Sequence, residues 1–387
     1  MNRRQLFKLF GGVAVTALAP LQRATRRGRI VVAGGGIIGS SIAYHLARRG
    51  AQVTLLEKDR PASGATRNSF AWINASFSKQ PRHYFELNRL GVEAYRHLDR
   101  ALAARLQIQW GGSLEWAGDA GRAQSLRKQV RGHQEWGYAT HLVDEAEFKQ
   151  LEKNIRPGPI RAACHSEYEG SVDPTRAVEA YLEQARNLGV EIRYPSEITG
   201  IEIRQGRLAG VQTVDGGISA NVLIIAAGVD TPRLAAMAGI QVPLKDSPGI
   251  LAHTKPLPEL INRVVLAPGA HMKQNPDGRI VTGVGFGGEP GTDTSRQKGV
   301  HILKEAEKFL PDLGNAALDR VSLGWRPLPK DDHPIVGFTD KSLDVYIAVM
   351  HSGVTLSAII GRLAALEILD GVQVDLLRHY RLSRFQP

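Results

Sequence analysis

The chain of 387 residues is long enough for two domains, and its 43% hydrophobic and 22% charged residues exclude a disordered or multispanning membrane protein. Its formal net charge of +11 falls to +5 without the six basic residues of the acid-free segment 1–28, so we expect no nucleic-acid partner. The single cysteine, Cys164, excludes an intramolecular disulfide, a multi-cysteine zinc site and a cysteine-bound iron–sulfur cluster, and we assign no metal site. We interpret Cys164 as a small buried side chain rather than a reactive thiol.

Residues 1–28 have the pattern of an export signal. Arg3 and Arg4 precede a short apolar stretch over 9–21 and a basic segment over 23–29, which is the order found in twin-arginine signals. A frayed basic tail is the alternative interpretation. The apolar stretch is too short for a confident transmembrane helix, so the pattern predicts a periplasmic protein that contacts the membrane only if the signal is retained.

A strand, a glycine-rich turn and a helix follow one another from residue 29. Residues 29–33 are apolar and β-branched, the glycines of 34–39 open a helix that Gly50 stops, and 52–57 is a second strand ending in an acid. Such glycines allow a pyrophosphate to approach a helix N-terminus, while the acid accepts hydrogen bonds from ribose hydroxyls and disfavours NADP. The pattern predicts a dinucleotide site, with a turn that only packs as the alternative. The candidate residues are Gly34, Gly36, Ile38, Gly39, Glu57 and Lys58.

The loop over 61–69 is dense in small and hydrogen-bonding residues. Such a loop can run along a pyrophosphate toward an isoalloxazine ring, and an ordinary polar surface loop is the alternative. The candidate cofactor-binding residues in it are Thr66, Arg67, Asn68 and Ser69.

Nucleotide-type elements recur in the middle and at the end of the chain. The run over 222–228 is almost continuously apolar, as in a strand covered on both faces, and 345–349 followed by 352–369 is a further strand-to-helix transition. Different material lies between them, which favours a discontinuous nucleotide domain. The rest of the sequence predicts helices over 81–106, 121–135, 173–188 and 294–310, strands over 108–110, 113–116, 191–194, 198–203 and 207–214, and a β-rich region over 242–325.

Six motifs in this order resemble the superfamily of FAD-dependent D-amino-acid oxidase, glycine oxidase and sarcosine oxidase, over nearly everything after residue 28. They are 31–39 with Glu57, 62–69, 169–174, 224–228, 324–327 with 332–337, and 351–356. The resemblance implies an α/β fold with a Rossmann-type FAD-binding domain and a substrate domain of an antiparallel β-sheet plus helices. We place the first domain at 29–85, 155–238 and 325–387, and the second at 86–154 and 239–324.

The same resemblance implies hydride transfer to flavin N5 from the carbon next to the amine nitrogen of a small amino acid or secondary amine. It implies that Arg326 pairs with the substrate carboxylate, and an arginine bound to backbone carbonyls is the alternative. His351 lines the site or holds a loop. The further cofactor-binding residues are Ile198, Ala227, Gly228, Ser352, Gly353, Val354 and Thr355, the last four at a helix N-terminus that stabilises an anionic flavin.

The sequence departs from the family pattern at two places. Phe70 and Trp72 are bulkier than the small residues often found after the flavin loop, which leaves the substrate size open. Neither Cys164 nor a histidine in 62–72 matches a covalent attachment point, so we expect non-covalent FAD. The electron acceptor, a quinone, a carrier protein or O₂, stays open. An enzyme acting on a modified nucleobase and a non-catalytic flavin-binding subunit are the alternative functions.

Overall fold

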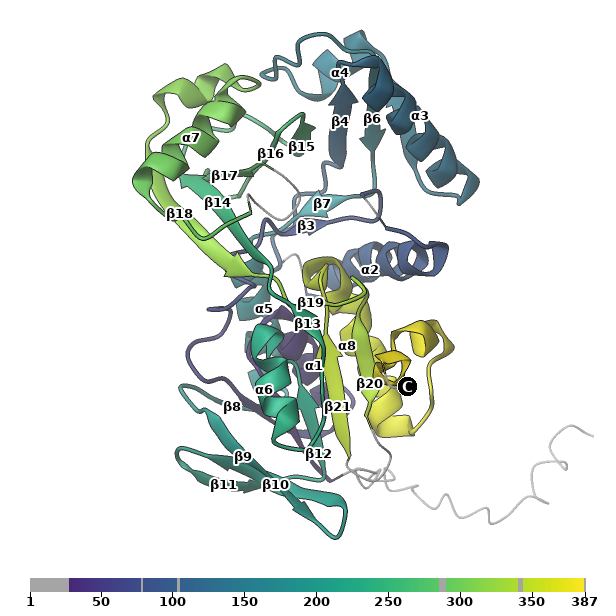
Figure 1. Cartoon of the computed structure of the whole chain (residues 1–387), viewed down its shortest axis with the longest axis vertical. Coiled ribbons are helices and arrows are strands. Elements are labelled where there is room, and N and C mark those ends of the chain that lie inside the picture. The colour runs from purple at the N-terminus through teal and green to yellow at the C-terminus, as the bar shows by residue number, and fades with distance from the viewer. Residues whose placement is uncertain (1–27, 78, 103–104, 285–289, 340–343, 386–387) are drawn as a thin grey trace, which may run out of the picture.

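The computed structural model describes residues 28–77, 79–102, 105–284, 290–339 and 344–385. The predicted signal, apart from Gly28, lies outside the described residues. In the described part of the chain, no helix combines the length and the apolarity needed to cross a membrane. Two sheets occupy opposite ends of an elongated molecule (Figure 1).

Six of the described strands form a twisted sheet of the Rossmann type in the lower half of Figure 1. Neighbouring strands in this sheet pair in parallel, except that β20 runs antiparallel to β21. Alternate residues of β1 enter different apolar cores, Ile30 and Val32 on one face and Val31 and Ala33 on the other, so the strand is covered on both sides. The order is β20 (Ile335–Phe338), β21 (Val345–Val349), β12 (Val222–Ile225), β1 (Arg29–Ala33), β2 (Gln52–Leu56) and β8 (Glu191–Arg193).

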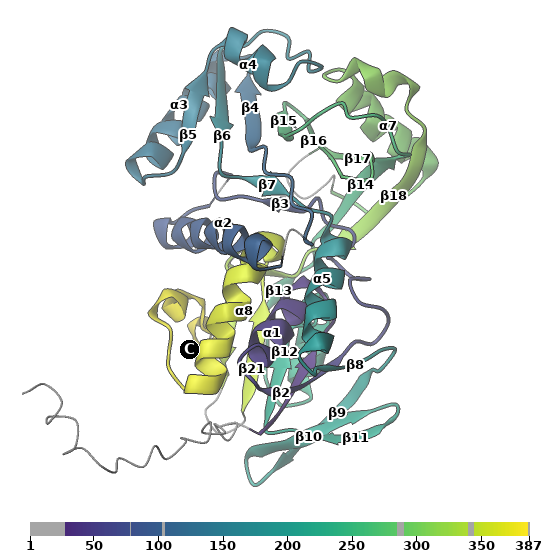
Figure 2. The ribbon, with the colours of Figure 1, turned by 180° about the vertical axis from the view of Figure 1, so that it is seen from behind.

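Helices cover one face of this sheet and a small meander covers the other. Figure 2 shows α1 (Ile37–Ala47), α5 (Pro174–Asn187) and α8 (Gly353–Asp370) on the helical face, and α2 (Arg82–Ala101) packs on α8. As predicted, Asp173 caps α5 by accepting from the backbone N–H groups of Thr175 and Arg176. The opposite face carries β9 (Ile198–Arg204), β10 (Arg207–Thr213), β11 (Gly216–Ser219) and α6 (Thr231–Ala236).

Eight described strands form the second sheet, which pairs antiparallel except where β15 runs parallel to β4. Cys164 is buried in β6, as predicted for a small packed side chain. The order is β18 (Leu318–Trp325), β14 (Pro248–Thr254), β17 (Ile280–Gly283), β16 (Ala270–Gln274), β15 (Val264–Ala267), β4 (Ser113–Ala117), β6 (Ala162–Ser166) and β5 (Thr140–Val143). Its helices are α3 (Ala120–Glu135), α4 (Glu145–Leu151) and α7 (Arg296–Glu307).

Two short antiparallel ribbons lie where the chain crosses between the sheets. They pair β3 (Trp72–Ile73) with β7 (Gly170–Ser171), and β13 (Leu244–Lys245) with β19 (Leu328–Pro329). Short 3₁₀ turns complete the described elements, namely η2 (Gly228–Asp230), η3 (Pro311–Asn315), η4 (Asp375–Tyr380) and η5 (Leu382–Phe385).

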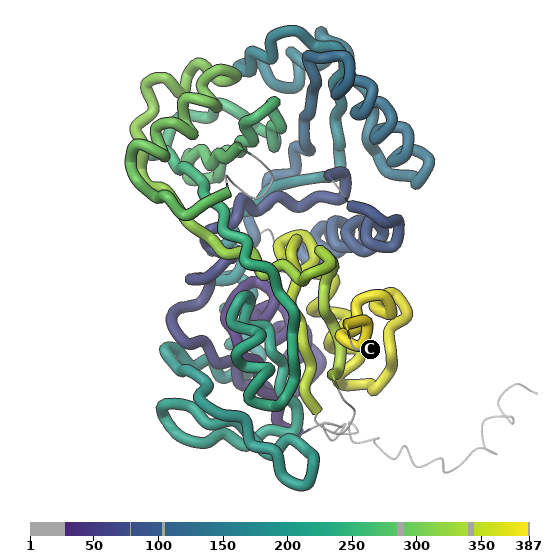
Figure 3. The backbone as a smooth tube through the Cα atoms, viewed as in Figure 1, coloured from purple at the N-terminus to yellow at the C-terminus, as the bar shows by residue number. Residues whose placement is uncertain are grey.

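The predicted division of the chain differs from the sheet membership at two places. Strand β6 was expected in the nucleotide domain, within 155–238, but it pairs with β4 and β5 in the eight-stranded sheet. Most of α2 was expected in the substrate domain, but this helix packs on α8 of the nucleotide half. Both differences arise because the elements pair or pack with partners far away in the sequence. In the same way, the lower half of Figure 3 combines purple, teal and yellow segments from the beginning, middle and end of the chain.

Candidate active site

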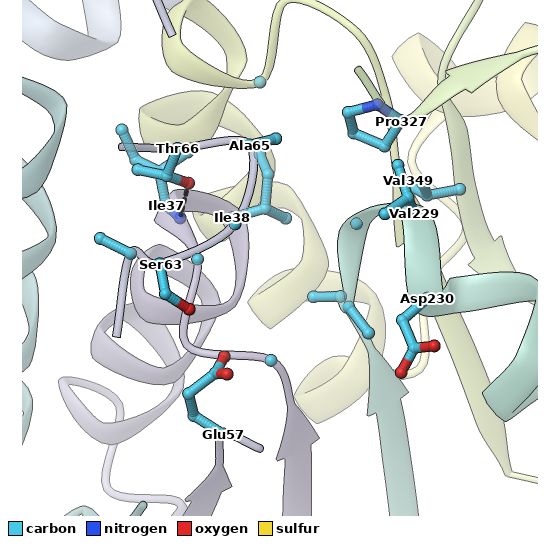
Figure 4. Close-up of a pocket in the computed structure, with 18 of the residues that line it drawn as sticks. Ile37, Ile38, Glu57, Ser63, Ala65, Thr66, Val229, Asp230, Pro327 and Val349 are labelled. Atoms are coloured by element: carbon cyan, nitrogen blue, oxygen red, sulfur yellow. Dashed lines mark hydrogen bonds between the residues drawn. The ribbon is translucent and has the colours of Figure 1, made fainter. Parts of the chain in front are cut away.

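A cavity of about 1070 Å³ opens where the parallel strands β1, β12 and β21 end. Its walls come from the turn after β1, the loop after β2, the turn after β12 and the turn before α8. Figure 4 shows Glu57, Ser63 and Thr66 on one side, with Val229 and Asp230 on the other. In open parallel sheets, ligands bind at this carboxyl edge.

The glycine turn after β1 leaves no room for side chains. Gly34 has a φ of +111°, and a Cβ there would lie 2.5 Å from the carbonyl oxygen of Ala226. A Cβ on Gly39 would lie 2.0 Å from the carbonyl oxygen of Gly34, so helix α1 packs directly on the turn. Gly36 lines the cavity in extended conformation at the start of α1. The turn therefore presents backbone, and a helix N-terminus, to whatever occupies the cavity.

Thr66 closes the loop onto this helix. Its Oγ1 accepts from the backbone N–H of Ile37 at 3.1 Å, a contact drawn in Figure 4. The backbone of the loop turns back on itself through Arg67 N–H to Ala62 O at 2.9 Å. Arg67 is exposed and is not among the residues that line the cavity, so its role as a cofactor-binding residue stays a prediction. The turn that seats Thr66 directs the next side chain into solvent.

Glu57 lies at the end of β2 and faces the glycine turn. Its Oε2 accepts from the backbone N–H of Gly35 at 2.7 Å, and its Oε1 accepts from that of Asp59 at 2.9 Å. Each carboxylate oxygen has a second lone pair, so Glu57 can also accept from the two hydroxyls of a ribose. Beyond it, the Lys58 ammonium lies 3.7 Å from a carboxylate oxygen of Asp230, across the cavity.

The N-termini of two helices meet at this cavity. A Cβ on Gly353 would lie 3.5 Å from the side chain of Ile38, which places the start of α8 beside the start of α1. The first intrahelical hydrogen bond of α8 runs from Leu356 N to Ser352 O, so the amides of residues 353–355 have no partner within the helix. The Thr355 hydroxyl donates to Trp72 O, which leaves its backbone N–H as the group that can contact a ligand.

These features fit FAD. The glycine turn forms a cradle that any Cβ would fill, and the carboxylate of Glu57 stands where a ribose needs acceptors. The amides at the two helix N-termini supply donors for a pyrophosphate and for an anionic ring. The cavity is also at the upper end of the size range of small-molecule sites, as an extended dinucleotide requires.

Arg326 lies at the far end of the cavity, directly after β18. Its Nε and Nη2 each contact a backbone carbonyl, of Ser247 and Pro248, at 3.3 Å. Desolvation lowers the pKa of Arg326, and among the described residues no carboxylate contributes a compensating charge. Arg326 therefore does contact backbone carbonyls, as the alternative interpretation expects, but these contacts are long. The guanidinium borders the cavity without an anionic partner from the described chain.

His351 lines the cavity beside Arg326. Desolvation, together with the positive charges of Lys79 and Arg326, lowers the pKa of His351 to about 3. The imidazole is therefore neutral at physiological pH.

The predicted site residues come together with two exceptions. Besides Arg67, Gly39 does not line the cavity, because it packs behind the turn. The predicted residues that line it are Gly34, Gly36, Ile38, Glu57, Lys58, Thr66, Asn68, Ser69, Ile198, Ala227, Gly228, Arg326, His351, Ser352, Gly353, Val354 and Thr355.

Sequence reasoning missed two polar residues behind the cavity wall, Lys79 and Tyr84. Lys79 Nζ donates to Ser352 Oγ at 2.6 Å, and Tyr84 OH donates to the same oxygen at 3.1 Å. Nothing near Lys79 in the sequence indicates this contact, because its partner is 273 residues away.

Phe70 and Trp72, singled out as departures from the family pattern, form the wall beneath the eight-stranded sheet. Both side chains are buried, and they pack on Leu251, Leu266 and Val281 of that sheet while lining the cavity.

Comparisons with known proteins agree with this site. The family model described as FAD dependent oxidoreductase (DAO) matches residues 29–366. Hydrogen cyanide synthase subunit HcnC of Pseudomonas aeruginosa is 27% identical over 92% of this chain and 96% of that protein. Glycine oxidase of Bacillus licheniformis is 24% identical over 92% of this chain and 96% of that protein.

Solved structures share the whole fold. L-proline dehydrogenase from P. horikoshii has a TM-score of 0.84 at 25% identity, covering 93% of this chain and 98% of its own. Glycine oxidase from Bacillus cereus has a TM-score of 0.83 at 22% identity, covering 93% and 99%, a likeness of fold alone. Because the family model extends from the glycine turn into α8, and the cavity between them fits the cofactor, the chain belongs to the FAD-dependent oxidoreductase (DAO) family and its cofactor is FAD.

Proposed function

We propose that this enzyme oxidises the carbon next to the amine nitrogen of a small amino acid or secondary amine. The observation that carries the proposal is the position of Arg326. Its guanidinium borders the cavity, and within the described chain it contacts only two backbone carbonyls, each at 3.3 Å. Relatives named for glycine, sarcosine and L-proline support a substrate of this size. Bound FAD supplies the hydride acceptor, which no amino-acid side chain can replace.

Arg326 binds the substrate carboxylate in this proposal. Its planar fork matches two carboxylate oxygens, and a partly desolvated guanidinium gains more from an anion than a solvated one does. With its carboxylate held by the Arg326 guanidinium, the substrate has its amine and the adjacent carbon turned toward the interior of the cavity. The neutral His351 adds no charge that would repel the substrate ammonium group.

The remaining residues exclude water and stabilise negative charge. Phe70 and Trp72 cover the cavity on the side of the eight-stranded sheet, so a small substrate displaces water from an apolar wall. The amides at the start of α8, which have no partner within the helix, stabilise negative charge on the reduced cofactor. We expect FAD to be held by these contacts without a covalent bond, because Cys164 is buried in β6 away from the cavity.

The direct test is anaerobic reduction of the purified holoenzyme. Glycine, sarcosine, L-proline, D-proline and D-alanine are each added without O₂, and the oxidised flavin band is followed. Bleaching by at least one of them is the expected result. A flavin that dithionite reduces but that no compound of this panel bleaches would contradict the proposal.

A second candidate function is favoured by the match to HcnC over nearly the whole of both chains. That relative is named as a subunit of a synthase, so we also consider glycine oxidation within a larger assembly. This candidate predicts bleaching by glycine alone and copurification with partner proteins from the native organism. The alternatives of a modified nucleobase and of a subunit without turnover predict no bleaching by any compound of the panel.

For the location and the electron acceptor, we propose export and transfer to a quinone or an electron-carrier protein. The twin-arginine pattern of residues 1–28 supports export, since that route carries folded, cofactor-loaded proteins. Replacing Arg3 and Arg4 by lysine should leave the protein in the cytoplasm in a fractionation experiment. An unchanged distribution between the compartments would contradict export by this route.

A further inference from the structure

Lys79 is a buried cation placed directly behind the cavity wall. It lies between β3 and α2, the residue is 4% exposed, and its Nζ donates to Ser352 Oγ at 2.6 Å. Ser352 lines the cavity and precedes α8 in left-handed conformation, with a φ of +58°. One hydroxyl group therefore separates the ammonium of Lys79 from the cavity, at the N-terminus of α8.

The surroundings fix Lys79 in this place. Tyr84 donates to the same Ser352 oxygen at 3.1 Å, and its ring centroid lies 5.5 Å from Lys79 Nζ. The charge of Glu169 acts on Lys79, but that carboxylate already accepts from Ala75 N–H, Ser76 N–H, Tyr138 OH and Ser113 OH. Glu169 therefore anchors the segment that carries Lys79, with its charge shared among four donors.

Keeping an ammonium group here is costly. Desolvation lowers the pKa of Lys79 to about 7, against a smaller opposing effect of Glu169. Packing alone would be served better by an apolar side chain of the same length. The amides at the start of α8 have no partner within the helix, and a cation beside them adds to their positive potential. Low-dielectric surroundings strengthen both the field of the cation and that of the helix dipole.

We propose that Lys79 is a positioning residue, which holds Ser352 and raises the reduction potential of bound FAD by stabilising negative charge at the α8 end of the cavity. The proposal deepens the proposed function and rests on it only for the presence of FAD. Lys79 does not line the cavity, so it acts through Ser352 and through its charge.

The test is the two-electron reduction potential of the holoenzyme, measured with redox dyes and no substrate at pH 6.5. Lys79→Met should lower the equilibrium constant for reduction at least tenfold, which corresponds to about 30 mV. Lys79→Arg should restore most of the loss. Lys79→Gln, which keeps a donor for Ser352 but no charge, should resemble Lys79→Met.

Lys273 provides a matched control. It is 1% exposed, burial lowers its pKa to about 7 as well, and its Nζ donates to Val172 O rather than to a residue of the α8 turn. Lys273→Met should leave the potential unchanged. A wild-type potential in Lys79→Met, an equal shift in Lys273→Met, or loss of FAD from both uncharged Lys79 variants would overturn the proposal. Because no substrate is used, failure of the amino-acid panel leaves this result intact.

Discussion

Replacing Arg326 by alanine tests the proposed substrate contact. The guanidinium contacts two backbone carbonyls at 3.3 Å, longer than typical N–H···O bonds, so its removal should cost the fold little. The truncation should therefore act on substrates that carry a carboxylate and spare those that do not. Proline and pyrrolidine form a suitable pair, because they share the ring amine and differ in the carboxylate.

The expected magnitude follows from the lost hydrogen bonds. Each bond from a charged donor contributes about 1.5–3 kcal/mol, and the planar fork of Arg326 can form two with one carboxylate. A loss of about 3 kcal/mol corresponds to ~100-fold in kcat/KM for proline. Arg326→Lys keeps the charge but loses the fork, and should cost about tenfold.

Stopped-flow reduction of the bound flavin measures both substrates in wild type and variants. For pyrrolidine we expect a slow reaction whose kcat/KM is the same in wild type and in Arg326→Ala. Equal losses for proline and pyrrolidine would contradict the carboxylate contact, because they would show that Arg326 shapes the cavity through its carbonyl contacts. An unchanged rate with proline would equally exclude the carboxylate contact.

Three further predictions concern the turn, the buried lysine and the apolar wall. Gly39→Val should abolish FAD binding in a titration of the apoprotein, since its Cβ would lie 2.0 Å from a carbonyl oxygen, whereas Gly132→Ala in α3, with open space around it, should bind normally. Burial lowers the pKa of Lys273 to about 7, so between about pH 7 and pH 10 this lysine is neutral in the folded state and protonated in the unfolded state, and stability should rise with pH across this window. Lys273→Met should reduce that slope in denaturant titrations by about 1.4 kcal/mol per pH unit, and the same change at the exposed Lys149 should not. Phe70→Ala should open the wall and lower the KM for amines with bulky groups, while an unchanged substrate range would place this side chain outside the substrate path.

Local signals explain what could be predicted from the sequence. The glycine turn needs Gly34 and Gly39 at fixed spacing, and a Cβ at either position would collide with a carbonyl oxygen. The Asp173 cap and the left-handed turn at Gln205 and Gly206 are likewise set by neighbouring residues. Because the cavity edge consists of the turns that follow parallel strands, most of the candidate cofactor residues line the cavity.

Long-range partners explain what could not be predicted. Strand β6 pairs with β4 across about fifty residues, and the parallel pairing of β15 with β4 joins segments even further apart. The placement of Lys79 behind Ser352 depends on how the whole nucleotide half packs. Arg67 could not be distinguished from its neighbours Thr66 and Asn68 by residue type, since the direction of each side chain depends on how the loop folds back.

The central claim, that this cavity oxidises a small amino acid or amine with FAD, is tested most directly by a single turnover without O₂. Holoenzyme is mixed with an excess of the compound that bleaches the flavin, and the oxidised product is quantified by mass spectrometry after quenching. We expect one equivalent of product per bound FAD, oxidised at the carbon next to the nitrogen. Bleaching without such a product, or a product oxidised at another carbon, would contradict it.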